Sequence, residues 1–444
     1  MSENKSKVWD VVVIGGGAAG MMASATAAHN GAETLVIEKN KTLGVKLLIT
    51  GGGRCNVTNA ETDTRKFLAK FKDNSKFLFS AFSRYGVKET LEFFHSRGMP
   101  TKVENELRVF PVSDSAQSVW DVLVKYMLEN KVALTSDTPV VGFEMTDGAI
   151  TGVKLKNGKV VFGKNFILAT GGKSRPETGS TGDGFQWLRD IGHKVDDQDS
   201  ALVPLSTRDV WTKKLQGVTL KKVKMSVLQH DRVTSSSKVQ FKKEGQILFT
   251  HFGVTGPMVL NSSRDIGEMM KYGEVILSLD VCPTLTLEML DTTLRDFLRE
   301  ESNKKLKNSM KIFITQTDLP SALAPIILEL AGVDEDTPCH SVTKEMRKAL
   351  VHTFKHMDMT VSGLLGVDKA VITSGGVVLD EVDFKTMQSR LYPNLYLTGD
   401  ILNIDRPTGG YGLQLCWTTG YLAGTSAASS LPFAKGELPK GEGV

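Results

Sequence analysis

The sequence contains few cysteines, and none lies close to another along the chain. Among 444 residues there are only Cys55, Cys282, Cys339 and Cys416, and no pair has C-x-x-C spacing. This excludes a disulfide framework and the usual cysteine-based zinc sites. We therefore predict no metal site and a reducing, cytoplasmic location.

Long apolar runs are also missing. No stretch approaches the ~20 consecutive apolar residues that a helix needs to span a bilayer, and the opening residues MSENKSKVWD lack the apolar core of a secretory signal. The net charge is only +4, which by itself identifies no acidic or basic partner. We predict a protein without a membrane partner, whose 41% hydrophobic and 23% charged residues are typical of globular domains.

What the sequence does contain is a glycine-rich motif between two predicted strands, in residues 10–40, DVVVIGGGAAGMMASATAAHNGAETLVIEKN. The apolar, β-branched run Val11–Ile14 predicts a buried strand. An alanine-rich stretch through Ala28 predicts a helix that ends at Asn30-Gly31. Thr34–Ile37 predicts a second strand, so the whole forms a βαβ unit.

The glycines of this motif have the spacing G-x-G-x-x-G. In such a unit Gly15 allows the tight turn, Gly17 lets the backbone approach a pyrophosphate, and Gly20 lets helix and strand pack closely. Glu38 follows about 20 residues on, where a carboxylate bonds ribose hydroxyls and disfavours a 2′-phosphate. The motif predicts an adenine dinucleotide and leaves FAD and NAD open; the alternative is a tight turn without a ligand.

The C-terminal part favours FAD over NAD. NLYLTGD, residues 394–400, predicts a strand that ends on Gly399-Asp400, and RPTGGYGLQLCWTTGYLAGTSAA, residues 406–428, predicts a glycine turn that opens an apolar helix. An extended FAD needs such a return segment: a carboxylate for the ribityl chain, and a helix N-terminus near the anionic N1–C2=O edge of the reduced ring. The alternative is an ordinary strand–helix turn of the sheet.

A second glycine-rich loop, TGGGRCNVTN at residues 50–59, could approach a flat ring at Gly52 and Gly53. Asn56 offers both a hydrogen-bond donor and an acceptor, and Arg54 could meet a phosphate or an anionic substrate. Cys55 has no second cysteine nearby, which favours packing beside the cofactor over redox chemistry.

A third glycine-rich stretch, LATGGKSRPETGSTGDGFQWLRDIGH at residues 168–193, ends a predicted strand with Thr170, Gly171 and Gly172. The backbone there can approach the cofactor. Asp183, within TGDG, begins the next helix either as a cap or in a functional role.

The order of predicted elements indicates one nucleotide-binding domain of α/β class that is interrupted by an insertion. Alternating runs at about residues 140–165, separated by TDG and KNG, predict a small β-meander. We predict the FAD-binding domain at residues 1–195 and 364–444, a β-rich insertion at 196–284 and a helical insertion at 285–363.

Two features of the insertion concern function. His251, beside a glycine turn in LFTHFGVTGPMVL, could shuttle a proton, although a lone histidine is commonly structural. Lysines and arginines outnumber acidic residues between Leu205 and Gly245, which could attract nucleic acid or an acidic substrate. The aromatic residues of this stretch do not interleave with them in a stacking pattern, so a solvated strand face is favoured over a nucleic-acid partner.

With these motifs the chain resembles the BaiN-type family of bacterial FAD-binding flavoproteins, also described as NAD(P)/FAD-dependent or aminoacetone-oxidase-like oxidoreductases. The resemblance runs nearly end to end and rests on GGGAAGMMA, KLLITGGGRCNVTN, LATGGKSRPETGSTGDGF, LFTHFGVTGPMVL, AVITSGGV and TGGYGLQLCWTTGYLAG. It implies a glutathione-reductase-type Rossmann FAD-binding domain with an inserted β-barrel and a helical subdomain. ATGG followed by TGDG is also similar to fumarate-reductase and ketosteroid-dehydrogenase flavoproteins.

The motifs and the resemblance together predict the residues that hold FAD. They are Gly15, Gly17, Ala18, Ala19, Gly20, Glu38, Lys39, Lys46, Leu47, Gly52, Gly53, Arg54, Cys55, Asn56, Thr170, Gly171, Gly172, Gly399, Asp400, Gly410, Tyr411, Gly412, Leu413 and Gln414. No catalytic residue is identified; His251, Arg54 and Tyr411 are the candidates.

The chain departs from the family pattern close to the expected flavin. The family usually has Gly-Glu at the position of Gly399-Asp400, Leu-Asp at that of Leu402-Asn403, and Tyr-Asn-Leu-Gln at residues 411–414. Asp400 keeps a carboxylate on a shorter side chain, whereas Gly412 removes an amide. We therefore expect the polar contacts to the flavin to differ.

The resemblance implies an FAD-dependent oxidoreductase that moves a hydride between flavin N5 and an organic substrate. We predict reduction of an activated C=C bond in a small molecule, an enone or a bile-acid-like or steroid-like compound, with NAD(P)H as a transient electron donor. No second G-x-G-x-x-G is present, so NAD(P)H would reach the flavin without a domain of its own. The alternatives are a tRNA-modifying type of flavoprotein that uses the basic residues 205–245, an amine or aminoketone oxidase, and a flavin sensor without turnover.

Overall fold

The glycine motif joins two parallel strands, as the sequence predicts. In the computed structural model β1 (Val8–Ile14) leads into the glycine turn, α1 (Ala18–His29) follows, and β2 (Thr34–Ile37) returns beside β1 in parallel. The central strand is inaccessible to solvent from Val11 to Val13. The predicted βαβ unit is therefore present.

The structure describes residues 7–196, 200–230, 237–365, 372–373 and 375–431. Contacts divide the chain into two compact units, residues 1–200 with 371–444, and residues 201–370.

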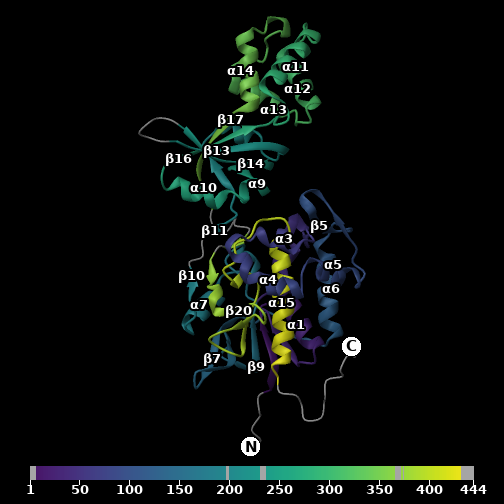
Figure 1. Ribbon diagram of the computed structural model, residues 1–444, viewed down its shortest axis with the longest axis vertical. Helices are drawn as coiled ribbons and strands as arrows, with labels where there is room; N and C mark the ends of the chain where they lie inside the picture. The colour runs from purple at the N-terminus through teal and green to yellow at the C-terminus, as the bar shows by residue number, and fades with distance from the viewer. Residues whose placement is uncertain (1–6, 197–199, 231–236, 366–371, 374, 432–444) are drawn as a thin grey trace, which may run out of the picture. The chain divides into compact units, whose positions relative to one another are not determined.

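A largely parallel sheet forms the centre of the first unit (Figure 1). The strands β6, β2, β1, β9 and β22 follow one another in this order, and each pair of neighbours is parallel. Antiparallel strands β20 and β21 extend one edge, and β7 and β8 form the predicted meander with β9. This confirms a Rossmann-type fold. The strand bounds are β6 (Ala133–Thr135), β7 (Val140–Thr146), β8 (Ala149–Leu155), β9 (Val160–Leu168), β20 (Val382–Asp383), β21 (Gln388–Ser389) and β22 (Leu395–Leu397).

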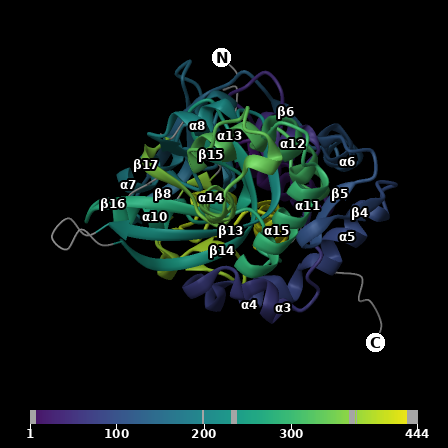
Figure 2. The ribbon, with the colours of Figure 1, turned by 90° about the horizontal axis from the view of Figure 1, so that it is seen from above.

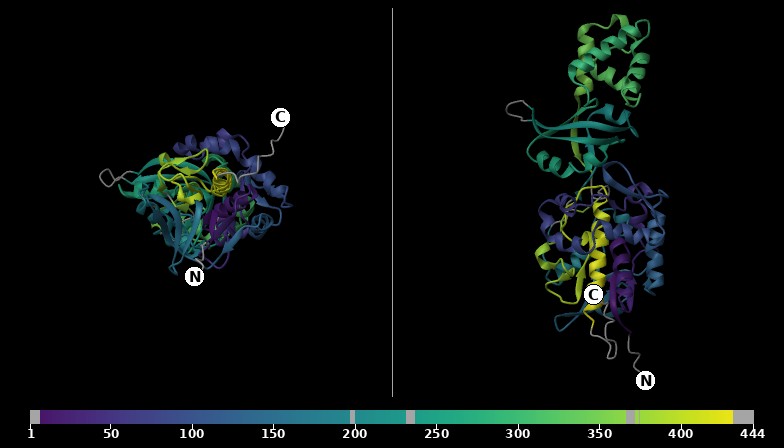
Figure 3. Two further views of the ribbon diagram at one scale, coloured as in Figure 1. Left: turned by 90° about the horizontal axis from the view of Figure 1, so that it is seen from below. Right: turned by 45° about the vertical axis from the view of Figure 1, so that its right-hand side comes forward.

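Helices α1 and α15 (Tyr411–Ser429) lie side by side in the first unit (Figure 1, Figure 3). Glycines allow this close approach: a Cβ at Gly420 would lie 2.6 Å from the Ala19 carbonyl oxygen, and one at Gly424 would overlap the Ala23 carbonyl oxygen. The contacts Ala19–Gly420 and Ala23–Gly424 advance together along both helices. The helices are therefore parallel.

The first unit contains further helices besides α1 and α15. Ser115 caps the longest of them, α6, by accepting a hydrogen bond from the Gln117 N–H. Three short strands that precede α6 in the chain, β3 (Thr58–Asn59), β4 (Thr101–Val103) and β5 (Arg108–Pro111), form a small antiparallel sheet. The helix bounds are α2 (Val45–Leu48), α3 (Thr64–Ala69), α4 (Ser75–Arg84), α5 (Val87–His95), α6 (Ala116–Glu129) and α7 (Asp183–Asp190).

Strands of the second unit close into a barrel in the order β12, β15, β14, β13, β16, β17. Strands β13 and β14 form a long hairpin, which Figure 2 shows beside β16. Alternate residues of β13, among them Val223, Met225 and Val227, are buried in the barrel core. The element bounds are β12 (Leu205–Thr207), α8 (Val210–Lys214), β13 (Thr219–His230), β14 (Ser237–Phe249), β15 (Gly253–Thr255), α9 (Pro257–Leu260), α10 (Ser263–Met270), β16 (Glu274–Asp280) and β17 (Met357–Leu364).

The helical insertion predicted at residues 285–363 differs from the structure at its C-terminal end. Met357–Leu364 is the strand β17, which pairs with β16 and β12 and closes the barrel. Its sequence MDMTVSGL alternates buried and exposed residues over most of its length, which is the period of a strand rather than of a helix. The helices and the strands share one apolar core, so residues 196–284 and 285–363 are not separate bodies. The helices are α11 (Leu287–Glu300), α12 (Leu306–Gln316), α13 (Leu323–Ala331) and α14 (Lys344–Lys355).

The described part of the stretch AVITSGGVVLD does not join the main sheet. Its strand β19 (Gly376–Val377) pairs antiparallel with β10 (Val195–Asp196) in a small separate sheet. Gly375 and Gly376 adopt φ of +88° and +134°, and this backbone turn interrupts the apolar run. Residues 370, 371 and 374 of the motif lie outside the described residues.

Within the described ranges, no helix combines the length and the apolarity needed to cross a bilayer. In the same ranges, no group of three or more His, Cys, Asp and Glu side chains is arranged to hold a metal ion.

The buried His193 connects the segment after α7 to the hairpin of β20 and β21. His193 Nδ1 lies 2.7 Å from a Glu381 carboxylate oxygen, and its Nε2 lies 2.9 Å from Ser389 Oγ. Ser389 Oγ in turn accepts the N–H groups of Leu391 and Tyr392. The Ser389 hydroxyl is itself buried and serves these bonds, so the chain of three residues is a structural connection rather than a nucleophile with its base.

This connection predicts a pH-dependent stability. Burial lowers the pKa of His193 below its usual 6.5, although Glu381 acts in the opposite direction. Because the unfolded chain binds the proton more readily, the stabilising effect of neutral His193 is complete above about pH 6.5 and is lost as the pH falls through the folded-state pKa. At pH 7.5 His193→Asn should reduce the free energy of unfolding by about 1–3 kcal/mol.

The difference in unfolding free energy between the wild type and His193→Asn should shrink as the pH is lowered from 7.5 to 5.5, measured by urea unfolding. His29→Asn, the same substitution at an exposed histidine, serves as the control for the change of residue type. A pH-independent difference for His193→Asn would contradict this account.

Candidate functional site

The N-terminus of α1 faces open space. Gly15 adopts φ of +101°, and a Cβ there would lie 2.6 Å from the Ala169 carbonyl oxygen; a Cβ at Gly20 would overlap the Gly15 carbonyl oxygen. Gly17, in contrast, has nothing within 4 Å of a Cβ position, and no side chain caps the helix. Uncapped N–H groups with partial positive charge beside open space are suited to an anion such as a pyrophosphate.

Glu38 supports this turn from the end of β2. Its side chain is buried, and its two carboxylate oxygens accept the N–H groups of Gly16 at 2.7 Å and of Asn40 at 2.8 Å. Each carboxylate oxygen keeps a second lone pair, so the group could still accept ribose hydroxyls. Glu38 therefore has a structural role in addition to the predicted one.

The N-terminus of α15 extends beyond the N-terminus of α1 along the axis that the two parallel helices share. Tyr411 begins α15 nine residues before Gly420, whereas Ala18 begins α1 one residue before Ala19, on which Gly420 packs. At 1.5 Å of rise per residue the two helix ends are offset by roughly 12 Å. An extended dinucleotide could therefore contact both ends.

A charged cluster lies between β22 and α15. The Asp400 carboxylate accepts the Lys46 ammonium at 3.3 Å and forms an ion pair with Arg406, while Lys46 also donates to Ser174 Oγ at 2.7 Å. Burial by itself raises the pKa of Asp400, but Arg406 and Lys46 outweigh it and the net pKa is lowered. A Cβ at the adjacent Gly399 would lie 3.2 Å from Ala19 Cβ, so the cluster borders the first turn of α1.

Several polar atoms around these helix ends are buried without a partner. Among the described residues, Asn56 Oδ1, Thr170 Oγ1 and Arg406 Nε accept or donate no hydrogen bond. Buried polar atoms normally have partners, because an unsatisfied one costs about 1–3 kcal/mol. Together with the open space at Gly17, these atoms fit a bound polar ligand that supplies the missing bonds. FAD has this character.

The glycine loop at residues 50–59 has the conformation that its glycines allow. Gly52 and Gly53 adopt φ of +69° and +85° and have nothing within 4 Å of a Cβ position. Cys55 is fully buried, and burial raises the pKa of its thiol to about 12. The thiol is therefore protonated at neutral pH, which agrees with the packing role favoured by the sequence.

Arg54 is engaged in interactions within the protein. Its guanidinium donates to Asp114 at 2.8 Å, forms an ion pair with Glu104 and lies 4.2 Å from the centroid of the Phe110 ring. To reach a phosphate or a substrate it would have to leave two carboxylates. Arg54 thus remains a candidate only with a rearrangement of this loop.

Tyr411 and Gln414 are parts of the core. The Tyr411 ring packs 4.8 Å from the Phe67 ring, and burial raises the pKa of its hydroxyl. The Gln414 amide bonds Thr58 Oγ1 at 2.6 Å and Thr90 Oγ1 at 2.8 Å. Tyr411 can offer a ligand its backbone N–H group more readily than its side chain, whereas the Gln414 N–H already donates to the Gly410 carbonyl oxygen at 3.0 Å.

Some of the remaining predicted residues lie in the glycine turns, and others contact or pack beside these turns. Lys39 donates to Thr181 at 2.5 Å and to Asp183 at 3.0 Å, which links the end of β2 to the start of α7. Asp183 is therefore occupied by this contact and does not cap α7, whose N-cap is Gly182. Leu47 and Gly172 are buried, Gly171 and Gly410 adopt φ of +73° and +97°, and Leu413 packs against the core.

His251 belongs to the second unit. It is exposed in the turn between β14 and β15, and its ring packs edge-on against Phe252 at 4.8 Å between centroids. Its predicted role in proton transfer stays a prediction.

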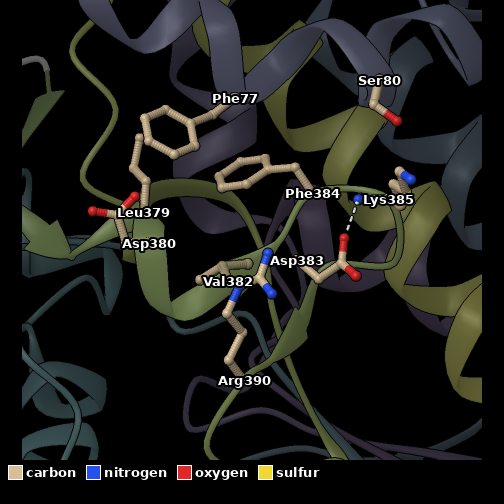
Figure 4. Close-up of a pocket in the computed structure, with 9 residues that line it drawn as sticks. All are labelled: Phe77, Ser80, Leu379, Asp380, Val382, Asp383, Phe384, Lys385 and Arg390. Carbon is tan, nitrogen blue, oxygen red and sulfur yellow. Dashed lines mark hydrogen bonds between the residues drawn. The ribbon is translucent and has the colours of Figure 1, made fainter.

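The structure also has a cavity that contains none of the predicted residues. It has a volume of about 280 Å³ and is lined by Phe77, Ser80, Leu379, Asp380, Val382, Asp383, Phe384, Lys385 and Arg390 (Figure 4). Phe77 and Phe384 face each other at 5.7 Å between ring centroids. The cavity lies at the hairpin of β20 and β21 and not at the helix N-termini.

Sequence reasoning missed Arg406 and Ser174, which both contact the Lys46–Asp400 pair. Arg406 directly precedes Pro407 and the glycine turn that opens α15. A cation beside a predicted anion site was the signal that could have identified it.

The sequence matches the family of the HI0933-like protein Rossmann domain over residues 9–426. It is 31% identical to the 3-dehydro-bile acid delta(4,6)-reductase of Clostridium scindens over 419 residues. These residues cover 94% of this chain and 98% of that protein. It is 28% identical to the ribosomal RNA dihydrouridine synthase of Escherichia coli over 414 residues. These residues cover 93% of this chain and 96% of that protein.

A solved structure has the same fold over its whole length. The 3-ketosteroid delta1-dehydrogenase from Sterolibacterium denitrificans, in complex with 1,4-androstadiene-3,17-dione, superposes with a TM-score of 0.53 over 96% of this chain and 100% of that chain. The two sequences are 14% identical, so this likeness concerns the fold alone.

The two glycines at the start of α1 allow packing to be separated from ligand contact. Gly20→Ala should lower the free energy of unfolding of the flavin-free protein by about 3 kcal/mol, because its methyl group overlaps backbone. Gly17→Ala should change this free energy by less than about 1 kcal/mol, yet its methyl group would occupy the open space before the helix. We expect the purified Gly17→Ala protein to hold less FAD per chain, measured from flavin absorbance. A full FAD content would contradict a pyrophosphate site at Gly17.

Proposed function

The chain belongs to the HI0933-like family, as its motifs predict, and we propose that it reduces a carbon–carbon double bond conjugated to a carbonyl group. Membership makes it a flavin-dependent oxidoreductase. The proposed substrate is a small enone, with a reduced nicotinamide as the electron donor.

The proposal rests on one observation: two relatives that match over nearly their full length are named for different substrates but for similar chemistry. One is a delta(4,6)-reductase of a 3-dehydro-bile acid, and the other forms dihydrouridine in ribosomal RNA. Dihydrouridine differs from uridine by saturation of the C5=C6 bond, which is conjugated to a carbonyl group. Both names thus describe hydrogen added across a double bond, and we infer the same reaction class for this chain.

The residues of the first unit fit the cofactor of this chemistry. FAD, when bound, supplies hydride transfer at its N5 atom. We propose that the N-terminus of α1 binds the pyrophosphate and that Glu38 binds the ribose. Asp400, which its two cations keep ionised, would accept the ribityl hydroxyls, and the N-terminus of α15 would face the ring.

The overall reaction consumes one NAD(P)H and one proton for each double bond reduced. The hydride is added to the carbon remote from the carbonyl group, and the proton to the carbon adjacent to it. Arg54 is held by two carboxylates and Tyr411 is buried against Phe67, so neither is arranged as the proton donor. His251 and solvent remain as candidates for this proton.

A second candidate substrate, a uridine of ribosomal RNA, is favoured by the outer face of the β13–β14 hairpin. Lys222, Lys224 and Lys242 lie on this face, opposite the buried residues of β13. Lys224 pairs with Glu244 at 3.6 Å, whereas Lys222 and Lys242 have no ion pair in the part of the chain that the structure describes. Unpaired lysines on an exposed face could contact phosphates.

Anaerobic stopped-flow absorbance tests the reaction class. NADH or NADPH should bleach the visible absorbance of the bound flavin, because a hydride is transferred to it. A 3-oxo-Δ4 steroid added afterwards should restore the absorbance, with one saturated ketone formed for each nicotinamide oxidised. The saturated ketone serves as the control and should restore nothing. If neither an enone nor a uridine-containing RNA restores the flavin absorbance, and only oxygen does, the proposed reduction is contradicted.

The two substrate classes are distinguished by RNA binding. If the substrate is RNA, a ribosomal RNA fragment should bind with a steep salt dependence, and Lys222→Glu combined with Lys242→Glu should weaken it about tenfold or more at low salt. Lys66→Glu with Lys88→Glu in the first unit is the control of equal charge. Absence of salt-dependent binding by the wild type would leave the small enone as the substrate.

A further inference from the structure

Resting on the FAD-dependent function proposed above, we infer that Arg406 is a fixed positive charge at the N-terminus of α15 that stabilises the reduced form of the flavin. Arg406 lies outside the glycine motifs and outside the residues that the family resemblance assigns to the cofactor.

Arg406 is buried and only partly satisfied. Its residue is 5% exposed, one terminal nitrogen donates to the Ile404 carbonyl oxygen at 2.9 Å, and the other forms an ion pair with Asp400. Its Nε is buried and donates to no acceptor among the described residues. A guanidinium has five N–H donors in a rigid plane, so this edge is available to an acceptor.

The open edge is directed at the first turn of α15. A Cβ at Gly412, the second residue of the helix, would lie 3.0 Å from Arg406 Nε. A methyl group at residue 412 would therefore crowd the guanidinium, which would have to shift to accommodate it. Of the three positions at which this chain departs from its family near the flavin, Arg406 contacts two, Asp400 and Gly412. A shorter carboxylate and a missing amide leave room that Arg406 fills.

The cluster around Arg406 carries one positive charge in excess. Asp400 faces two cations, Lys46 and Arg406. The neighbouring Cys416 does not balance them, because burial raises the pKa of its thiol to about 12. The N-terminus of α15 adds a partial positive charge. The Arg406 side chain is buried, whereas that of Lys46 is 26% exposed, and an anionic ligand group beside Arg406 would balance the excess charge at the buried end of the cluster.

The reduced flavin is the anion that fits this position. Reduction by two electrons with uptake of one proton leaves one negative charge on the N1–C2=O edge of the ring, whereas the oxidised ring is neutral. The pyrophosphate already has the N-terminus of α1, which is offset from α15 by roughly 12 Å. Arg406 should therefore favour the reduced over the oxidised cofactor, and not simply strengthen FAD binding.

The midpoint potential of the bound flavin tests this inference, measured by anaerobic titration against a reference dye. Arg406→Gln should lower the preference for the reduced form by about tenfold, which corresponds to about 30 mV for a two-electron couple. Arg406→Lys should retain part of the effect. Arg97→Gln is the matched control: Arg97 also has a buried Nε without a partner, but it stacks on Phe93 and Tyr126 and should leave the potential unchanged.

Gly412→Ala provides an independent test if Arg406→Gln loses its flavin. In the wild-type background its methyl group should shift the guanidinium and lower the midpoint potential of the flavin. Combined with Arg406→Gln or Arg406→Lys, in double variants that hold flavin, Gly412→Ala should cause no further change in the potential. An unchanged potential in flavin-loaded Arg406→Gln, or an equal drop in Arg97→Gln, would overturn the inference. A wild-type protein that holds no flavin would instead overturn the proposed function.

Discussion

The close packing of α1 on α15 is the constraint on which the first unit depends. Gly420 and Gly424 bring α15 against the backbone of α1 at Ala19 and Ala23, and no larger side chain would fit there. Because both helices follow parallel strands of one sheet, their N-termini point toward the same edge. The contact also determines their offset along the axis. A site for an extended dinucleotide thus follows from backbone packing and does not require a specific polar side chain.

The charged and polar groups near the N-termini of α1 and α15 differ in whether they have partners within the protein. The acidic residues near the helix ends already have partners, Glu38 with two backbone N–H groups and Asp400 with two cations. The polar atoms that remain open are an amide oxygen, a hydroxyl and a guanidinium nitrogen, on Asn56, Thr170 and Arg406. The protein therefore presents uncharged and positive groups at this edge, which suits a ligand that carries phosphates and becomes anionic on reduction.

Relatives of this chain are named for a bile acid and for ribosomal RNA, although both match it over nearly the full length. A common fold with a common flavin chemistry can thus serve substrates of very different size. Selection among them must come from residues outside the helix N-termini. The second unit carries the exposed lysines of the β13–β14 hairpin, and we expect such selection to arise there.

The order of elements in the first unit could be predicted from sequence, because the period of apolar residues and the glycine spacing are local properties. The strand Thr34–Ile37 and the meander were found in this way. The strand Met357–Leu364 was missed, since its partners β12 and β16 lie far away in the chain. Sequence alone thus determined the dinucleotide-type fold and the family. Only the tertiary structure decided that Arg54 and Tyr411 are engaged elsewhere, and that Arg406 meets Asp400 and Gly412, because side-chain partners depend on contacts between distant segments.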